Sequence, residues 1–351
     1  MTDESTIPAE PSTPKRTRRQ LIQWAIGGSV AAVGVGYLGY TAVVSQKTTI
    51  RLGIAPGTQT LWRYIAQRQV DLFGPTKYAL LFNNYEDEDH LRAAFVAKEI
   101  DIMASLVPTV ASLSEAGIAA KLFQPMAWLR EGYPFIVPNG SSITDLAGLR
   151  GRRVAMYPLN HPGMGYWRAL ALASAHLPLR DLNLVETLTP DVSLKEKKVE
   201  AASLGGAQWA NLQAQPGFHK LTDLQTTWSS YSGSTRLLLY GGFIARREFV
   251  EANSEFIGLF LKVHQDGLTA YKSNRTSFLN VTAAYPSPEM NQAQNQAQAT
   301  YLGYDDVDVG RLAVTDSDVA DYQRLFDLMG QAGYLKSPPS DVSGFFYRSI
   351  T

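Results

Sequence analysis

The sequence contains no cysteine. This absence excludes disulfide bonds, thiolate catalysis, zinc sites built on cysteine, and lipid attachment through an N-terminal cysteine. An excess of charge of one sign is also lacking, because 32 lysines and arginines balance 32 aspartates and glutamates. A neutral chain has no net field with which to attract nucleic acid. We therefore expect no nucleic-acid partner.

Signatures of common enzyme classes are missing as well. The five histidines form neither the H-x-x-x-H nor the H-E-x-x-H spacing of zinc hydrolases. No serine lies in a G-x-S-x-G pattern, and no phosphate-binding loop of the Walker type occurs. We therefore predict a protein that is not an enzyme, that holds no metal or cofactor, and that is not the ATPase of a transporter.

The chain does have the length and composition of a two-lobed globular protein. It has 351 residues, of which 45% are hydrophobic, and 28 are glycines. From Thr48 onward, apolar runs typical of strands alternate with amphipathic segments typical of helices. This alternation predicts α/β lobes with mainly parallel sheets. The strands expected include Ile50–Ala55, Tyr78–Phe82, Ile100–Ala104, Val154–Tyr157 and Arg236–Ala245, and the helices include Gln59–Val70, Asp87–Lys98, Glu255–Tyr271, Ser287–Thr300 and Asp316–Gly330.

The first 47 residues read as a targeting region. A polar stretch, Met1–Pro14, precedes the basic segment Lys15–Trp24 and an apolar, glycine-rich run, which is the shape of a secretory signal. The Arg18–Arg19 pair resembles a twin-arginine motif, so we expect the twin-arginine export machinery as a partner and the periplasm or cell surface as the location. The alternative is an uncleaved membrane anchor through residues 24–44, because that run is about long enough to cross a bilayer.

The stretch Thr144–Trp167 is the most informative part of the chain. It reads as a short helical turn, a basic corner, a strand, a loop with Gly163 and Gly165, and the start of a helix. A strand that enters a helix through glycines points unpaired backbone N–H groups and the positive end of the helix dipole toward the space above the sheet. The pattern therefore predicts a corner that binds a ligand.

Four segments carry a resemblance to a known family. They are Thr49–Trp62, Leu91–Val110, the segment DLAGLRGRRVAMYP within Thr144–Trp167, and Gly241–Leu268. In this order they resemble the solute-binding proteins of ABC importers in the nitrate, sulfonate and taurine group. The resemblance implies a two-lobed type II periplasmic-binding-protein fold, with the chain passing twice between the lobes. It also implies a monomer that binds a small molecule in the interlobe cleft and delivers it to a membrane permease.

The lobe boundaries follow from where the chain would cross. We expect residues 48–138 to form the first part of lobe 1, residues 139–235 to form lobe 2, and residues 236–351 to return to lobe 1 with C-terminal helices. In this scheme Gly132–Pro138 is a strand that runs out of lobe 1, and the loop Asn139–Ser142 is the first crossing.

The same resemblance assigns the pocket. Its first loop would contain Thr58, Gln59 and Trp62, its second Ser105 and Thr109, and its third Asn160, His161 and Gly163, with Trp209 as an apolar contact. Core or domain-face packing is an equally good interpretation of both tryptophans. In the third loop the family often has a serine or threonine that contacts an anion. Asn160–His161–Pro162–Gly163 stands there instead, which favours a ligand other than a sulfonate or nitrate.

Two further alternatives remain open at this level. The acidic run Glu86–Asp89 is interpreted either as a cation or amine site or as negative charge that favours a helix N-terminus. The function could also be that of a membrane-anchored ligand sensor. An enzyme on the same fold, related to pyrimidine synthases, is disfavoured because those relatives use a cysteine-containing motif.

Overall fold

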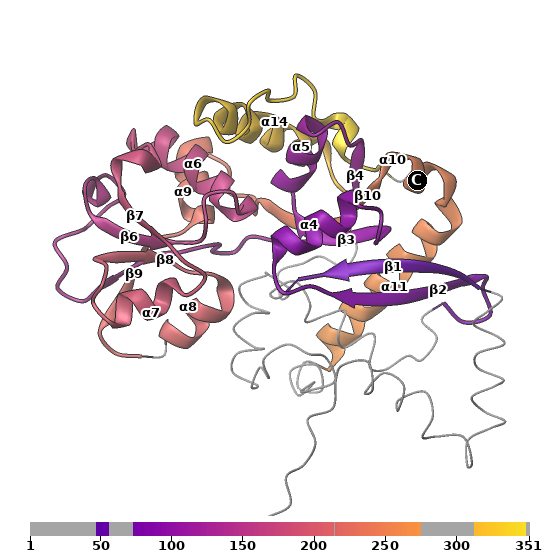
Figure 1. Cartoon of the computed structure of the whole chain (residues 1–351), viewed down its shortest axis with the longest axis horizontal. Coiled ribbons are helices and arrows are strands. Elements are labelled where there is room, and N and C mark those ends of the chain that lie inside the picture. Colours follow the sequence, from indigo (N-terminus) through magenta and orange to yellow (C-terminus); the bar gives the residue numbers. More distant parts are fainter. Residues whose placement is uncertain (1–46, 56–72, 214, 275–311, 349–351) are drawn as a thin grey trace, which may run out of the picture. The chain divides into compact units, whose positions relative to one another are not determined.

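The described part of the chain is built on two β-sheets with helices packed against them (Figure 1). The computed structural model describes residues 47–55, 73–213, 215–274 and 312–348. Several predictions lie outside these residues, including the signal or anchor, the helices Gln59–Val70 and Ser287–Thr300, and the site residues Thr58, Gln59 and Trp62. The described residues from 49 onward belong to one compact unit that includes both sheets.

The first sheet has the strand order β2-β1-β3-β10-β4. Strand β3 is parallel to β1, whereas β10 is antiparallel to both β3 and β4. Every residue of β3 is buried, as expected for a central strand covered on both faces. The strands are β1 (Thr48–Ile54), β2 (Tyr78–Asn84), β3 (Ile102–Leu106), β4 (Ala120–Trp128) and β10 (Leu239–Arg246). The helices of this part are α4 (Glu88–Val96), α5 (Pro108–Glu115), α10 (Arg247–Ala252), α11 (Ser254–Ser273) and α14 (Asp316–Gln331), followed by the 3-10 turn η3 (Ser343–Phe345).

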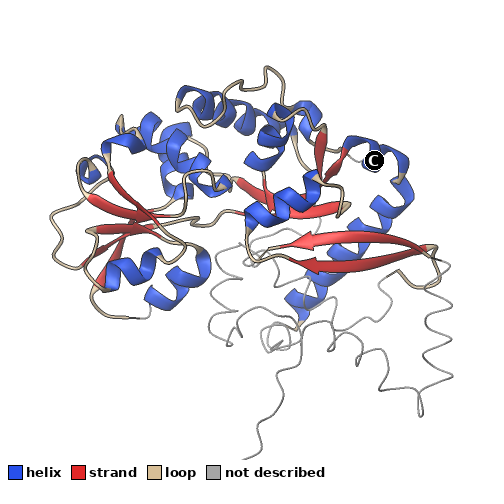
Figure 2. Ribbon diagram, in the orientation of Figure 1, coloured by secondary structure: helices blue, strands red, loops and turns tan. Residues whose placement is uncertain are grey.

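The second sheet has the order β7-β6-β8-β5-β9. Strand β6 is parallel to β7 and β8, and β5 is antiparallel to β8 and β9. Helices α7 and α8 lie on one face of this sheet and α6 and α9 on the other (Figures 1 and 2). The strands are β5 (Phe135–Pro138), β6 (Arg153–Met156), β7 (Asn183–Glu186), β8 (Ala201–Ser203) and β9 (Phe218–Thr222). The helices are α6 (Pro162–Ala175), α7 (Pro190–Lys195), α8 (Gly206–Gln213) and α9 (Leu224–Ser232), with 3-10 turns at η1 (Ala147–Leu149) and η2 (Leu179–Asp181).

Both sheets are therefore mixed, and the antiparallel strands are those next to the crossings. Strand β10 follows the return from the second sheet, and β5 follows the exit from the first. By contrast, β1 with β3 and β6 with β8 are joined by connections that contain helices, and these pairs are parallel.

The position of the first crossing corrects the sequence analysis. The segment expected to end lobe 1, Gly132–Pro138, contains β5, which pairs with β8 and β9 in the second sheet. The chain turns before that strand, where Gly132 and Tyr133 have positive φ values of 69° and 41°. The first crossing therefore ends in the turn Gly132–Tyr133–Pro134 and not in the polar loop after Pro138.

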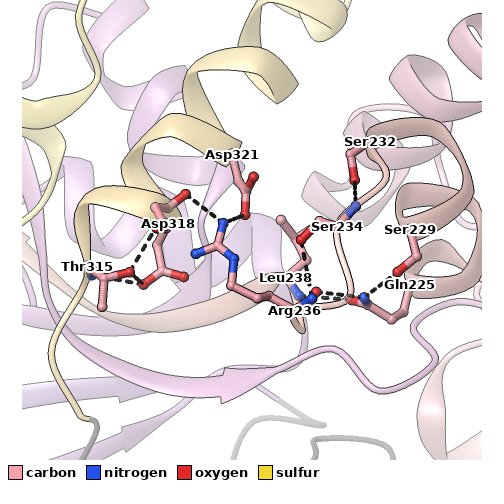
Figure 3. Close-up of polar contacts among 10 residues, drawn as sticks. Gln225, Ser229, Ser232, Ser234, Arg236, Leu238, Thr315, Asp318 and Asp321 are labelled. Atoms are coloured by element: carbon pink, nitrogen blue, oxygen red, sulfur yellow. Dashed lines mark hydrogen bonds and ion pairs between the residues drawn. The ribbon is translucent and has the colours of Figure 1, made fainter.

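The two crossings are tied to each other and to both halves of the fold. The backbone N–H of Leu129 donates to the carbonyl of Leu238 at 2.8 Å. The Gln225 amide of α9 donates to the Arg236 carbonyl at 2.9 Å and accepts from the Leu238 N–H at 2.8 Å. The Arg236 guanidinium in turn lies 2.5 Å from the Asp321 carboxylate of α14 (Figure 3). The return segment between α9 and β10 is therefore hydrogen-bonded to α9 and to the first crossing, and it is ion-paired with α14.

Helix α6 connects the second sheet to elements of the first. Its Tyr166 hydroxyl lies 2.8 Å from the Tyr322 hydroxyl of α14 and donates to the Tyr240 carbonyl at 3.0 Å. Both tyrosines and the neighbouring Trp167 have no exposed surface. Truncation of a buried aromatic residue of this size typically costs about 3–5 kcal/mol. The contact is thus a substantial part of the core.

Among the helices that the structure describes, none has the length and apolar character needed to span a membrane.

Candidate functional site

The carboxyl end of β3 places two hydroxyls where the sequence predicted them. Ser105 is the penultimate residue of β3, and Thr109 lies in the first turn of α5, which begins at Pro108. Both side chains are fully buried, with their oxygens 2.8 Å apart. Gly241 of β10 allows this close packing, because a Cβ atom there would lie 2.7 Å from the Ser105 carbonyl oxygen.

The acidic run contributes a third member to this group. The Ser105 hydroxyl donates a hydrogen bond to the Glu88 carboxylate, so Thr109 is the donor in its contact with Ser105. Burial raises the pKa of Glu88 from 4.5 to about 7, against the opposing effects of the Ser105 hydrogen bond and of Arg92. Near neutral pH this carboxyl is therefore present in both protonation states.

The neighbouring Asp87 has a structural role at the N-terminus of α4, which is one of the two interpretations of the acidic run. Its side chain caps α4 by accepting a hydrogen bond from the His90 N–H at 2.8 Å. Burial raises the pKa of Asp87, but the hydrogen bonds from the backbone and side chain of His90 and from the backbone of Asp89 lower it, and the net effect is a lowered pKa. The interpretation of the acidic run as charge at a helix N-terminus therefore holds for Asp87, while its interpretation as a cation or amine site stays a prediction. Asp87 caps the helix, and Glu88 contacts the hydroxyl of Ser105.

The loop between β6 and α6 contains the second predicted group. His161 is the N-cap of α6, and its Nδ1 accepts a hydrogen bond from the Gly163 N–H at 3.0 Å. Burial lowers the pKa of His161 from 6.5 to about 4. The imidazole is therefore neutral at pH 7, and the hydrogen bond at Nδ1 places its proton on Nε2.

A hydrogen bond joins the β6–α6 loop to the acidic run at the start of α4. The Asn160 side-chain amide donates to the Asp89 carboxylate at 3.0 Å, across a sequence separation of 71 residues. Asp89 also pairs with Arg92 at 2.9 Å on the same helix. Asp89 and Arg92 line a hollow of about 460 Å³ between α4 and α5. The loop of the second sheet thus contacts the start of α4 beside an accessible recess.

Sequence reasoning missed an aromatic cluster beside this contact. Tyr133 lies edge-on to Tyr157 and His161, with ring centroids 5.8 and 5.9 Å away, and its ring is tilted against Tyr240 at 6.1 Å. The His161 ring is stacked on Tyr157 at 5.1 Å. The unusual Gly132–Tyr133–Pro134 turn was the only sequence signal for Tyr133, and it was interpreted as part of a strand.

Gly163 has a steric role in the same cluster. A Cβ atom at this position would lie 2.5 Å from two carbons of the Tyr133 ring. The Tyr133 carbonyl accepts hydrogen bonds from Trp167 Nε1 at 2.9 Å and Ser203 Oγ at 3.1 Å, which fixes the residue. The glycine is therefore needed for the close approach of α6 to the first crossing.

Trp209 contacts the first crossing. Its indole N–H donates to the Glu131 carboxylate at 2.7 Å, and its ring packs against the smaller core cluster of the second sheet. Glu131 is also paired with Lys220 at 3.0 Å. These contacts agree with the packing interpretation of Trp209 and leave its role toward a ligand a prediction.

The described residues contain no group of three histidine, aspartate or glutamate side chains placed to hold a metal ion. The arrangement instead offers hydroxyls, carboxylates, a neutral imidazole and tyrosine rings. Such a mixture of apolar surface and a few placed polar groups is typical of small-molecule sites.

Comparisons with known proteins give the fold. No protein-family model matches the sequence, and no curated protein is significantly similar to it. Solved structures do match. The periplasmic aliphatic sulphonate binding protein SsuA from Escherichia coli has a TM-score of 0.64 and 16% identity, over 86% of this chain and 92% of that protein.

Two other solved structures match over similar lengths. The alkanesulfonate-binding protein SsuA from Xanthomonas axonopodis pv. citri, bound to MOPS, has a TM-score of 0.63 and 15% identity, over 87% and 99% of the two chains. The ligand-binding component of an ABC-type import system from Staphylococcus aureus has a TM-score of 0.62 and 14% identity, over 86% and 97%. The chain therefore has the α/β fold of periplasmic binding proteins that the sequence predicted.

Proposed function

We propose that this chain is the extracytoplasmic solute-binding component of an ABC importer. In this proposal each sheet with its helices is one lobe, and the segments 129–134 and 233–238 are the crossings between them. A small organic molecule binds where the lobes meet and is delivered to a membrane permease. Export by the twin-arginine machinery and a monomeric state belong to the same proposal.

The observation that carries the proposal is the contact between Asn160 and Asp89. It joins the β6–α6 loop to the start of α4, next to Ser105 at the end of β3. In open α/β sheets, ligands bind beyond the carboxyl ends of the strands. Two such ends that meet at one polar group are what a two-lobed binding protein requires. The names of the structural neighbours, which are binding proteins of import systems, support the same role.

The proposed mechanism is a shift of population between open and closed lobes. A ligand stabilises the closed form only through contacts that the open form lacks. Ser105 and Thr109 would provide contacts from lobe 1, with Thr58, Gln59 and Trp62 of the first pocket loop. The residues proposed for lobe 2 are Asn160, His161, Gly163 and Trp209. Because no chemical step is needed, we propose a binding protein and not an enzyme.

A thermal-shift screen of the purified full chain against a library of small solutes tests this function. A ligand at 100 times its Kd stabilises the folded state by about 2.7 kcal/mol. For a chain of this size that corresponds to roughly a 5 °C rise in Tm. Small-angle scattering with the hit should show a more compact particle. If no solute raises Tm and no small molecule is released from the protein on denaturation, the proposal is wrong.

A further inference from the structure

Two side-chain donors of the proposed pocket face carboxylates of the chain itself. The Ser105 hydroxyl donates to Glu88, and the Asn160 amide donates to Asp89 at 3.0 Å. Both donors were assigned to the ligand on the basis of the sequence alone. An incoming oxyanion would have to take these hydrogen bonds away from carboxylates and then lie next to the carboxylate charge.

The backbone donor at the start of α6 is occupied in the same way. The N-terminus of a helix is normally a favourable place for an anion, because its first N–H groups lack partners. Here the Gly163 N–H donates to the Nδ1 of His161 at 3.0 Å. The imidazole of His161 is neutral and adds no positive charge in return. An oxyanion therefore finds no free amide at Gly163, and the Arg92 guanidinium near His161 is already paired with Asp89.

Acceptor capacity, by contrast, is in surplus. A carboxylate provides about four acceptor positions. On Glu88 the Ser105 hydroxyl uses one, and on Asp89 the Asn160 amide and Arg92 use one each. Arg92 is engaged by Asp89, and the Asp89 side chain is 52% exposed beside the hollow between α4 and α5. Both carboxylates can accept further hydrogen bonds without breaking those already made.

We propose that this pocket selects an organic ligand that carries a cationic or hydrogen-bond-donating group and rejects sulfonates, with Glu88 and Asp89 as the specificity-determining residues. This inference rests on the solute-binding function proposed above. It separates the chain from its structural neighbours, two of which are described as sulfonate-binding proteins. The fold is shared, while the donors that would receive a sulfonate group are engaged by the chain's own acceptors.

The test compares ligand classes on the full chain by calorimetry at pH 8. The probes are agmatine and putrescine as organic cations, uracil as a neutral hydrogen-bond donor, and ethanesulfonate and nitrate as anions. We expect measurable binding of a cation or of uracil and none of either anion. Glu88→Gln and Asp89→Asn should each weaken the binding of a cationic hit about tenfold. Glu86→Gln, which removes an exposed carboxylate from the same run, is the matched control and should change nothing.

The outcomes separate the two proposals. Binding of ethanesulfonate or nitrate, with no binding of the other probes, overturns the ligand class and leaves the solute-binding function intact. The ligand class also fails if a cationic hit binds equally well to the wild type and to both carboxylate variants. If no probe of any class binds, the result counts against the solute-binding function and therefore against this inference as well.

Discussion

The side-chain amide of Asn160 donates a 3.0 Å hydrogen bond to the carboxylate of Asp89, although the loop of Asn160 follows a strand of the second sheet and the helix of Asp89 precedes a strand of the first. Asn160 lies in the loop before α6, and Asp89 lies in the first turn of α4. The bond therefore exists only when the ends of the two sheets are close together. Any variant that removes it should disfavour the closed arrangement without disturbing either sheet.

Replacement of Asn160 by alanine should weaken solute binding by roughly 2- to 10-fold. The reason is that one hydrogen bond of the closed form contributes about 0.5–1.5 kcal/mol. Calorimetry with a solute found in the screen measures the change. Asn183→Ala is the matched control, because it removes a 2.7 Å side-chain hydrogen bond to the Gly151 carbonyl within the second lobe. Equal affinities of the Asn160 variant and the wild type would show that the contact does not stabilise the closed form.

Glu88 should make stability depend on pH in a defined window. Its folded-state pKa of about 7 is above the ordinary value of 4.5, so the folded state binds more protons than the unfolded state between these values. The free energy of unfolding therefore falls as pH rises from about 4.5 to 7 and is unaffected by this group above that range. The charged groups around Glu88 are Asp87, Asp89 and Arg92 of its own helix, and Tyr334 faces it from the segment after α14.

The measurement is urea unfolding of the wild type and Glu88→Gln at pH 5 and pH 8. The wild type should lose about 1–3 kcal/mol relative to the variant between the two values, after allowance for partial exposure of the carboxyl. Glu86→Gln is again the control, and its difference from the wild type should be the same at both pH values. If the Glu88 variant also shows a constant difference, the carboxyl titrates at its ordinary pKa.

Gly163→Ala should destabilise the fold by about 1–3 kcal/mol, the usual cost of overpacking a core. The added methyl group would lie 2.5 Å from the Tyr133 ring, which is buried and cannot move aside freely. Gly258→Ala is the control in the second turn of α11, where a Cβ atom meets nothing within 4 Å. That change should stabilise by about 0.5–1 kcal/mol, since alanine is the better helix former. Unfolding midpoints that shift in the same direction for both variants would contradict the proposed steric role.

Much of the fold could be predicted because its signals are local. The amphipathic pattern of Asp316–Gly330 predicted α14 to within one residue. The β6–α6 corner was also found, since a strand followed by glycines has one common interpretation. The sheet that contains Phe135–Pro138 could not be predicted in this way. A short apolar run of four residues is compatible with either sheet, and only long-range pairing decides.

Only the places of the candidate site residues could be predicted for the same reason. Ser105 lies at the end of β3, and Asn160 and Gly163 lie at the β6–α6 corner, but their role toward a ligand stays a prediction. A sequence also does not show which acceptor a donor will find. Their partners come from other parts of the chain, as in the pairing of Asn160 with Asp89. The acidic run illustrates the limit, because consecutive residues on a helix point in different directions. Asp87 caps the helix while Glu88 contacts Ser105.

We expect the ion pair between Arg236 and Asp321 to stabilise the folded state at the return crossing. The Arg236 guanidinium lies 2.5 Å from Asp321 (Figure 3), whose side chain is only 14% exposed. Arg236 also donates to the Ser317 carbonyl at 3.1 Å. Burial raises the pKa of Asp321, and the charge of Arg236 opposes this effect. We expect a coupling of about 1–2 kcal/mol, above the 0.2–1 kcal/mol usual for exposed pairs.

A double-mutant cycle with Arg236→Gln and Asp321→Asn measures this coupling by urea unfolding. The same cycle on Lys262 and Asp266 is the control, because that pair lies 2.9 Å apart on α11 with both side chains more than half exposed. Its coupling should be about 0.3–0.5 kcal/mol. Because Arg236 joins the return segment to α14, Arg236→Gln should also alter solute affinity, whereas the Lys262 variant should not. A coupling no larger than that of the control pair would mean that the ion pair adds nothing to the hydrogen bonds that Gln225 and Leu129 make at the crossing.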